Sequence, residues 1–285
     1  MAIEKAVLNN LRRFATAFRE ARERGANESD TVMYLIKFCE DVLGYDSLKG
    51  EISKELAIKD RYCDVALKVD GAVRVIVEAK AAGSALHDKH IEQAENYASR
   101  AGINWVVLTN TIDWRLYHLT FAEGEGITHE LAFEVDLLKQ LDADPEAAWS
   151  RLSLLTRESV HDDGLGEFWS RKKALSPASI VRALFTQDVL LVLRRELNRD
   201  APARLDLDDV FAAIRDVLSK DALIAAGDLG IRKSRKRRKY ARRAADATPG
   251  APSVGPEESG DDAGEDDGDD EPEADGGVTN EGGTS

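Results

Sequence analysis

Three side chains in two neighbouring apolar segments are the strongest candidates for chemistry in this sequence. Asp64 lies in the first segment, and the second ends in Glu78-Ala79-Lys80. Glu78 and Lys80 are two residues apart, so on a strand they point to the same face. Burying a carboxylate and an ammonium beside a Val/Ile-rich strand is costly. Together with Asp64 they predict a Mg²⁺ site, because hard cations prefer carboxylate oxygens and phosphodiester hydrolysis uses a metal, a water and a nearby proton acceptor.

The connection between these two segments sets a condition for that site. Residues 62–79 indicate a β-hairpin, because Asp70-Gly71 is typical of a tight two-residue turn. Such a turn between regular strands would place Asp64 opposite Val77, on the other face from Glu78. A metal site shared by Asp64 and Glu78 therefore requires an odd-length loop or a β-bulge in this hairpin.

The flanking segments predict how the hairpin is held. Helical spacing of apolar residues and stop signals at Gly25 and Gly44 indicate two helices, and runs of β-forming residues alternate with one more helix. The expected elements are helices at 3–24 and about 28–43, a strand or strand plus turn at 48–58, a helix at 86–100, and strands at 103–109, 112–121 and 127–135. This order predicts an α/β fold in which the helix at 86–100 covers a mixed sheet.

A helical appendage is expected to follow, at residues 136–230. Short apolar segments fill 137–155. Ser176 and Pro177 then form an N-cap and first turn for a helix that continues to about Arg199. Asp206-x-x-Asp209 is a capping signal for a further helix at roughly 207–226. Core packing is the expected role of this generic region.

The charge of the chain is distributed in three blocks. The net charge is −14, but residues 246–285 alone carry 14 Asp or Glu and no Lys or Arg. Residues 231–243 carry nine basic residues and no acidic one, so residues 1–230 hold 39 − 9 = 30 basic and 53 − 14 = 39 acidic residues, a net charge of −9. The tail 246–285 has too few apolar residues to fold, which predicts disorder.

The basic segment, which we take as residues 231–245, has two interpretations. It could be an arm that contacts phosphates, with Tyr240 stacking on a base. It could instead be a solvated segment that balances the acidic tail. The candidate nucleic-acid-binding residues are Arg235, Lys236, Arg237, Arg238, Lys239 and Tyr240.

Cysteine usage and hydropathy restrict the cellular context. Cys39 and Cys63 are the chain's two cysteines, and neither has a partner at metal-ligand spacing, which indicates a reducing compartment. No apolar run approaches about 18 residues, so no membrane span is expected. The N-terminus lacks the apolar region of a signal peptide. A cytoplasmic location is the resulting expectation.

Each candidate site residue also has a purely structural interpretation. Asp64 could cap a turn, and Glu78 with Lys80 could form a solvated pair at a strand end. Glu28 lies at the N-terminal end of an expected helix, where a carboxylate complements the helix dipole. It could instead be a third acidic group that reaches the metal. Spacing alone favours the dipole role.

Further motifs connect these residues to a known family. Gln93 and Tyr97 lie four residues apart on one face of an expected helix, and the next strand pair reads Thr-Asn-x-x-x-Trp-Arg-Leu-Tyr. With Asp64 and Glu78-Ala79-Lys80, these motifs resemble the PD-(D/E)XK nuclease superfamily. More closely, residues 27–119 look like the N-terminal nuclease domain of type I restriction enzyme R subunits. The D…ExK triplet is weak by itself, but the ordered set is considerably more specific.

The resemblance implies a restriction-endonuclease-like core and a role for each matching residue. Asp64 and Glu78 would bind Mg²⁺ or Mn²⁺, and Glu28 matches the glutamate near the start of the family's first core helix, a third member of the metal site. Lys80 would orient or activate the attacking water and help stabilise the pentavalent phosphate.

Two more residues match the family's auxiliary motif. Gln93 and Tyr97 would position the substrate or the active-site groups. Tyr97 could alternatively be a core residue.

The chain also departs from the family pattern. A type I R subunit continues into an ATP-driven motor, whereas this sequence contains no GxxxxGK[ST] phosphate loop. The expectation is a Mg²⁺-dependent DNA endonuclease of restriction or defence type without its own motor, which could serve a separate motor or restriction-system subunit. The alternatives are a non-catalytic DNA-binding or interaction module that keeps the nuclease fold, and an adaptor that works through its disordered tail. The expected domains are residues 1–135 for the nuclease-like part, then 136–230, 231–245 and 246–285.

Overall fold

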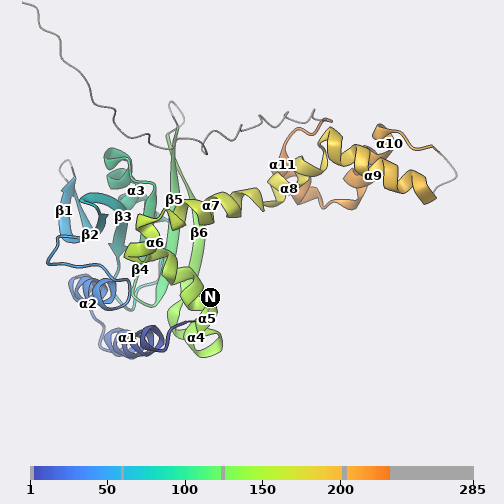
Figure 1. The fold of residues 1–285 in the computed structure, drawn as a ribbon. Helices are drawn as coiled ribbons and strands as arrows, with labels where there is room; N and C mark the ends of the chain where they lie inside the picture. Colours follow the sequence, from blue (N-terminus) through green and yellow to red (C-terminus); the bar gives the residue numbers. More distant parts are fainter. Residues whose placement is uncertain (1–2, 59–60, 123–125, 201–203, 232–285) are drawn as a thin grey trace, which may run out of the picture. The chain divides into compact units, whose positions relative to one another are not determined.

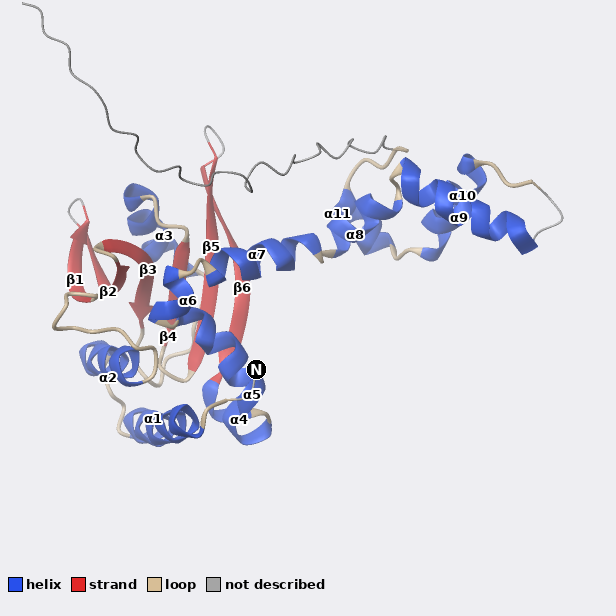
Figure 2. Ribbon diagram, viewed as in Figure 1, coloured by secondary structure: helices blue, strands red, loops and turns tan. Residues whose placement is uncertain are grey.

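A single mixed sheet forms the centre of this computed structural model, which describes residues 3–58, 61–122, 126–200 and 204–231. Six strands lie in the order β1-β2-β3-β4-β5-β6, with helices on both sides (Figures 1 and 2). The strands are β1 (Ile52–Ile58), β2 (Arg61–Val69), β3 (Ala72–Ala79), β4 (Trp105–Thr109), β5 (Asp113–Ala122) and β6 (Gly126–Asp136).

Helices and one short 3₁₀ turn make up the rest of the regular secondary structure of the described residues. They are α1 (Lys5–Glu23), α2 (Glu28–Asp41), α3 (Lys89–Ala101), α4 (Leu137–Ala143), α5 (Pro145–Leu152), η1 (Ser153–Leu155), α6 (Arg157–His161), α7 (Gly164–Ala174), α8 (Pro177–Leu184), α9 (Gln187–Asp200), α10 (Leu207–Val217) and α11 (Lys220–Ala226). No described helix is long and apolar enough to cross a membrane.

The strand directions follow from the connections between them. β3 and β4 are parallel, and α3 is the crossover that a parallel pair requires. The other neighbouring strands pair antiparallel. α3 packs on one face of the sheet, where Ile91, Ala94 and Ala98 meet Ile76 and Leu108. The expected α/β fold, a mixed sheet flanked by helices, is confirmed.

The opposite face of the sheet carries a larger core. Val65, Val77 and Leu116 pack there against Phe18 of α1 and Phe38 of α2. Buried side chains of α4, α5, η1 and α7 belong to this same core; they are Leu137, Leu138, Leu141, Ala148, Trp149, Leu152, Leu155 and Leu165. The predicted domain boundary after residue 135 stays a prediction. The helices α4, α5 and α7, which follow that boundary, pack in the same core as the sheet.

The first two helices end where glycine permits it. Gly25 follows α1 with φ +68°, and Gly44 lies just beyond α2 with φ +78°, a left-handed conformation that costs glycine little. The Asn27 side chain accepts a 2.9 Å hydrogen bond from the backbone N–H of Asp30 and so caps α2. The first helical residue of α2 is therefore Glu28, as the sequence predicts.

The last four helices, α8 to α11, have a small core of their own. Phe185, Leu190 and Val210 are among its buried residues, and none of its members belongs to the sheet core. The predicted start of α8 at Ser176-Pro177 is confirmed, because Ser176 accepts from the N–H of Ser179. The capping box of Asp206 and Asp209 at α10 is also confirmed.

Two predicted long helices in this region are wrong. The helix expected from Ser176 to about Arg199 breaks after Leu184, where the fully buried Phe185 turns into the small core and Thr186 precedes a new helix. The helix expected over about 207–226 breaks after Val217, because the Ser219 side chain accepts from the N–H of Ala222 and caps α11.

The basic and acidic C-terminal segments lie outside the described residues beyond Ile231. The candidate nucleic-acid-binding residues Arg235, Lys236, Arg237, Arg238, Lys239 and Tyr240 lie there too.

Candidate metal-dependent active site

A β-bulge in the β2–β3 hairpin decides which carboxylates face each other. Val69 pairs with Ala72 across a two-residue turn, and Leu67 pairs with Val75, so one residue of β3, Arg74, has no partner. Asp70 and Gly71 have φ of +52° and +77°, as that kind of turn requires. The bulge shifts the register by one residue from Val75 onward. The condition derived from the sequence is thereby met.

The shifted register places Asp64 opposite Glu78. Val65 pairs with Val77, so the next residues along β2 and β3 are Asp64 and Glu78. Asp64 Oδ2 accepts a 2.8 Å hydrogen bond from the backbone N–H of Ala79, which holds the aspartate across the end of β3. Glu78 is 1% exposed. Both carboxylates therefore lie at the end of β3, on the face that α3 covers.

Lys80 connects Glu78 with the start of α2. Its Nζ lies 2.7 Å from Glu78 Oε1 and 3.0 Å from Glu28 Oε1. The backbone N–H of Lys80 donates to the carbonyl of Thr109, which extends the β3–β4 pairing to this residue. The structure thus brings Glu28, Asp64, Glu78 and Lys80 into one group, although Glu28 is far from the others in sequence.

Burial dominates the electrostatics of this group. It raises the pKa of Glu78 to about 7, with the charge of Asp64 adding to the effect and Lys80 opposing it. Burial also raises the pKa of Asp64 above its ordinary value. Burial by itself would lower the pKa of Lys80, but the carboxylates of Glu78 and Glu28 together raise it. The ion pair with Lys80 is therefore too weak to keep Glu78 at an ordinary acidic pKa.

The donor atoms fit a hard cation that keeps part of its water shell. Glu78 Oε2 is buried and has no hydrogen-bond partner, and it is the kind of orphaned acceptor that a cation satisfies. Among the described residues, no three His, Cys, Asp or Glu side chains come together as a metal-binding group. Mg²⁺ is commonly held by one or two carboxylates, with waters and substrate phosphates completing the shell. Asp64 and Glu78 supply that number.

The two residues of the auxiliary motif lie on α3. Gln93 belongs to the helix that packs over β2, β3, β4 and β5, and its side chain is exposed. Tyr97 follows one turn later on the same helix, but its side chain lies outside the described part of the chain. Their roles stay predictions.

Asn110, in the turn between β4 and β5, and Arg115, on β5, hold the loop that follows Lys80, and neither was among the site residues predicted from the sequence. The Asn110 side chain accepts from the N–H groups of Ile112 and Asp113 and donates to the carbonyl of Ser84, in the loop after Glu78-Ala79-Lys80. Arg115 donates to the carbonyl of Leu86 in the same loop. Both residues belong to the Thr-Asn-x-x-x-Trp-Arg-Leu-Tyr motif. The motif marks this region in the sequence, but it does not by itself give a role to either residue.

Two more charged or titratable residues act on the site from its surroundings. Glu55 occupies the position of β1 opposite Asp64, has φ +47°, and its charge contributes to raising the pKa of Asp64. Burial and the charge of Lys80 lower the pKa of His90, at the start of α3. Sequence spacing gave no signal for either residue, because each depends on the tertiary fold.

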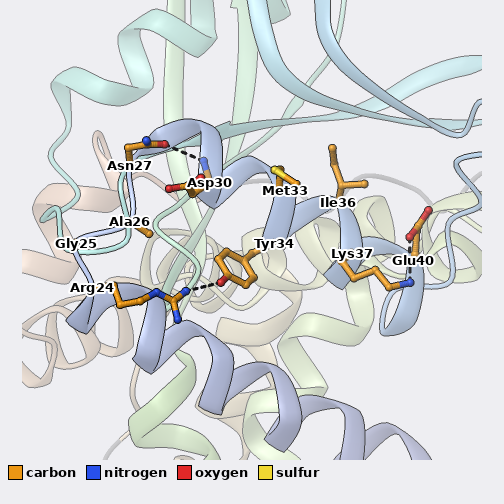
Figure 3. Close-up of a pocket in the computed structure, with 10 residues that line it drawn as sticks. All are labelled: Arg24, Gly25, Ala26, Asn27, Asp30, Met33, Tyr34, Ile36, Lys37 and Glu40. Carbon is orange, nitrogen blue, oxygen red and sulfur yellow. Dashed lines mark hydrogen bonds and ion pairs between the residues drawn. The ribbon is translucent and has the colours of Figure 1, made fainter.

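A large cavity lies near this group but is not part of it. It has a volume of about 860 Å³ and follows the outer side of α2. Figure 3 shows Arg24 pointing to the hydroxyl of Tyr34, which it contacts at 2.6 Å. The Asn27 cap lies on the same side of the cavity as Arg24, and Lys37 and Glu40 lie at the other end. None of Asp64, Glu78 and Lys80 lines this cavity.

The mixed sheet, its covering helices and the group at the end of β3 define a nuclease-like α/β domain. Residues 32–130 match the family model described as type I restriction enzyme R protein N terminus, which confirms the resemblance that the sequence motifs indicated. The match covers about a third of the chain's 285 residues. No curated protein and no solved structure matches the chain.

Proposed function

We propose that this protein is a Mg²⁺-dependent DNA endonuclease of restriction or defence type. The family match supports a nuclease-like role in defence. The observation that carries the proposal is the bulged register, which brings Asp64 and Glu78 together on one face beside Lys80. With all residues kept and a regular pairing from the two-residue turn onward, Asp64 would instead lie opposite Val77.

Each residue of the group has a separate task in this proposal. Asp64 and Glu78 bind the ion, whose charge neutralises the scissile phosphate and lowers the pKa of the attacking water. Lys80 donates hydrogen bonds to the water or to a phosphate oxygen and stabilises charge that develops in the transition state. Glu28 Oε1 lies 3.0 Å from Lys80 Nζ and helps to hold the ammonium at the end of β3, and its expected role as a third metal ligand stays a prediction.

Nicking of supercoiled plasmid DNA with Mg²⁺ or Mn²⁺ tests this function. Asp64→Ala and Lys80→Ala should each lower the cleavage rate by roughly 100-fold or more, because each removes a group that acts in the transition state. Lys139→Ala is a matched control, since Lys139 is an exposed lysine of α4 paired with Asp136. Cleavage that survives both active-site substitutions would contradict the assignment.

The same assay separates the two leading candidate functions. Absence of cleavage under every condition, with DNA binding retained, would favour a binding or interaction module that keeps the nuclease fold. Calorimetric titration of Mg²⁺ into wild type and Asp64→Ala then shows whether the carboxylate pair binds a cation without cutting.

A further inference from the structure

A second pocket lies between β6 and α7, with α5 beside it. It has a volume of about 450 Å³, and we call it the β6–α7 pocket. The lining residues that matter here are Phe133, Glu134, Arg151, Phe168, Arg171 and Lys172. None of Asp64, Glu78 and Lys80 lines this pocket. The pocket is therefore separate from the candidate active site.

The pocket gathers three cations without a free carboxylate. Its one acidic residue, Glu134, is paired with Arg115 at 3.0 Å. In the part of the chain that the structure describes, neither Arg151 nor Arg171 has an ion pair with a carboxylate. A helix C-terminus favours nearby cations, which explains why Arg151 lies in the last turn of α5 and why Arg171, Lys172 and Lys173 lie in the last turn of α7. It does not explain why both helix ends converge on one cavity.

Lys172 shows that the positive charge is concentrated there. Its Nζ donates to the backbone carbonyls of Leu131 and Ala132, at 2.5 and 2.6 Å. These neutral carbonyls fix the ammonium but do not neutralise it. Burial lowers the pKa of Lys172, and the neighbouring charge of Arg151 lowers it further. Arg151 and Arg171 are thus the two cations free to meet an anion.

An aromatic ring lies beside Arg151 and also lines the pocket. Phe168 is half-buried and meets Phe133 edge to face, with ring centroids 6.1 Å apart. The guanidinium of Arg151 lies 5.5 Å from the centre of the Phe168 ring. A flat ring beside a guanidinium suits a base, because every nucleobase has a π face, and the guanidinium suits a phosphate.

The charge of the rest of the body makes this cluster unusual. Residues 1–230 carry a net charge of −9, which repels nucleic acid as a whole. Local contacts must therefore provide attraction to phosphates. β6 is three strands away from β3 in the sheet, on the order of 15 Å at the usual strand spacing. That separation between the two strands is about the length of a few nucleotides of one nucleic-acid strand.

We propose that the β6–α7 pocket binds one nucleotide of a single-stranded nucleic-acid segment, with Arg151 and Arg171 on phosphate and Phe168 against the base. The proposal deepens the proposed nuclease function, because it names a strand contact outside the cleavage centre. It does not depend on whether the centre cuts.

Binding of fluorescein-labelled oligothymidylate to the full chain, followed by anisotropy in EDTA over a range of KCl concentrations, tests the pocket. EDTA prevents cleavage, so the measurement reports binding alone. The variants are Arg171→Gln and Phe168→Leu, with Lys139→Gln as the charge-matched control. All are compared in a background that carries Arg235→Gln, Lys236→Gln, Arg237→Gln and Arg238→Gln, which reduces any contribution from the basic segment.

Arg171→Gln should weaken binding several-fold and reduce the slope of log affinity against log salt by about 0.7, the value for one phosphate contact on a single strand. Phe168→Leu should weaken binding by roughly fivefold or more, with an unchanged slope, because it removes stacking only. Lys139→Gln should change neither quantity.

Equal affinity and slope for Arg171→Gln and Lys139→Gln would overturn the pocket proposal. If circular dichroism shows that Phe168→Leu has lost its fold, the exposed Arg171 decides the outcome alone. A chain that never cleaves DNA but shows the Arg171 effect would contradict the proposed function and support the pocket. A chain that cleaves DNA but shows no Arg171 effect would support the proposed function and contradict the pocket.

Discussion

Glu78 combines two properties that conflict at neutral pH. It is almost fully buried at the end of β3, and one of its oxygens has no hydrogen-bond partner. Its pKa is raised to about 7 even though Lys80 contacts it. A cation that binds Glu78 requires the ionised form, so the metal-free protein carries a carboxyl group whose protonation opposes metal binding.

The stability of the metal-free protein should therefore fall as pH rises. The folded-state pKa of Glu78 lies above its ordinary value of 4.5, so its stabilising contribution is complete below about pH 4.5 and is lost as pH rises through about 7. Glu78→Gln stays neutral at both pH values. Between pH 5 and pH 8 its free energy of unfolding should therefore fall by on the order of 2–3 kcal/mol less than that of wild type. Urea unfolding in EDTA at both pH values measures the free energy of unfolding of wild type and variant.

Glu130→Gln is the control for this experiment, because Glu130 is an exposed glutamate that is paired with Lys173. The control should lose the same stability as wild type over this pH range. An equal loss for wild type and Glu78→Gln would contradict the prediction.

The β2–β3 hairpin has the register that places Asp64 opposite Glu78. The turn is short and regular, and the extra residue is absorbed at Arg74 within β3. Arg74 is exposed, so the bulge displaces no core side chain. The residues that follow it, Val75 to Ala79, are all buried.

Deletion of Arg74 should preserve the site. It removes the unpaired residue, so the pairs Val69–Ala72 and Leu67–Val75 both survive and Asp64 stays opposite Glu78. Mg²⁺ affinity and plasmid nicking should remain within a few-fold of wild type. This outcome is expected because the register, and not the bulge as such, aligns the two carboxylates.

Deletion of Lys68, on the other strand, is the matched comparison. It leaves β3 with two residues in excess, so a regular pairing would carry Asp64 away from Glu78. Mg²⁺ binding and nicking should both be lost. The register argument fails if the two deletions behave alike, provided that circular dichroism shows both variants folded.

At the scale of the whole molecule, the described chain has separate cores. The sheet core includes α1, α2 and α4 to α7, whereas α8 to α11 pack around Phe185, Leu190 and Val210. No buried residue is shared between these two clusters. Separate cores allow separate unfolding.

Phe185→Ala should unfold the α8–α11 unit selectively. Phe185 is fully buried, and truncating a phenylalanine in a core costs about 3–5 kcal/mol, a large loss for so small a cluster. Hydrogen exchange should show lost protection of amides in α9 and α10. Amides of β3 and β4 should keep wild-type protection; their loss would show that the two cores unfold as one.

The sequence predicted the sheet, its crossover helix and the bulge condition, because apolar periodicity and turn residues report local geometry directly. The sequence analysis missed two helix breaks: the one at Phe185, which packing in the small core imposes, and the one at Ser219, which is a local N-cap. Glu28 could not be assigned from spacing, since its contact with Lys80 depends on how α2 meets β3. The resemblance, and not periodicity, supplied that residue.

Both edges of the sheet are interrupted. In β1, Glu55 has a positive φ, and in β6 the residue Ala132 has no partner on β5 while Lys172 covers its carbonyl. A regular exposed edge offers a continuous row of backbone donors and acceptors to the edge of another chain. The interruptions at Glu55 and Ala132 break that row in both edge strands, which disfavours strand-to-strand aggregation.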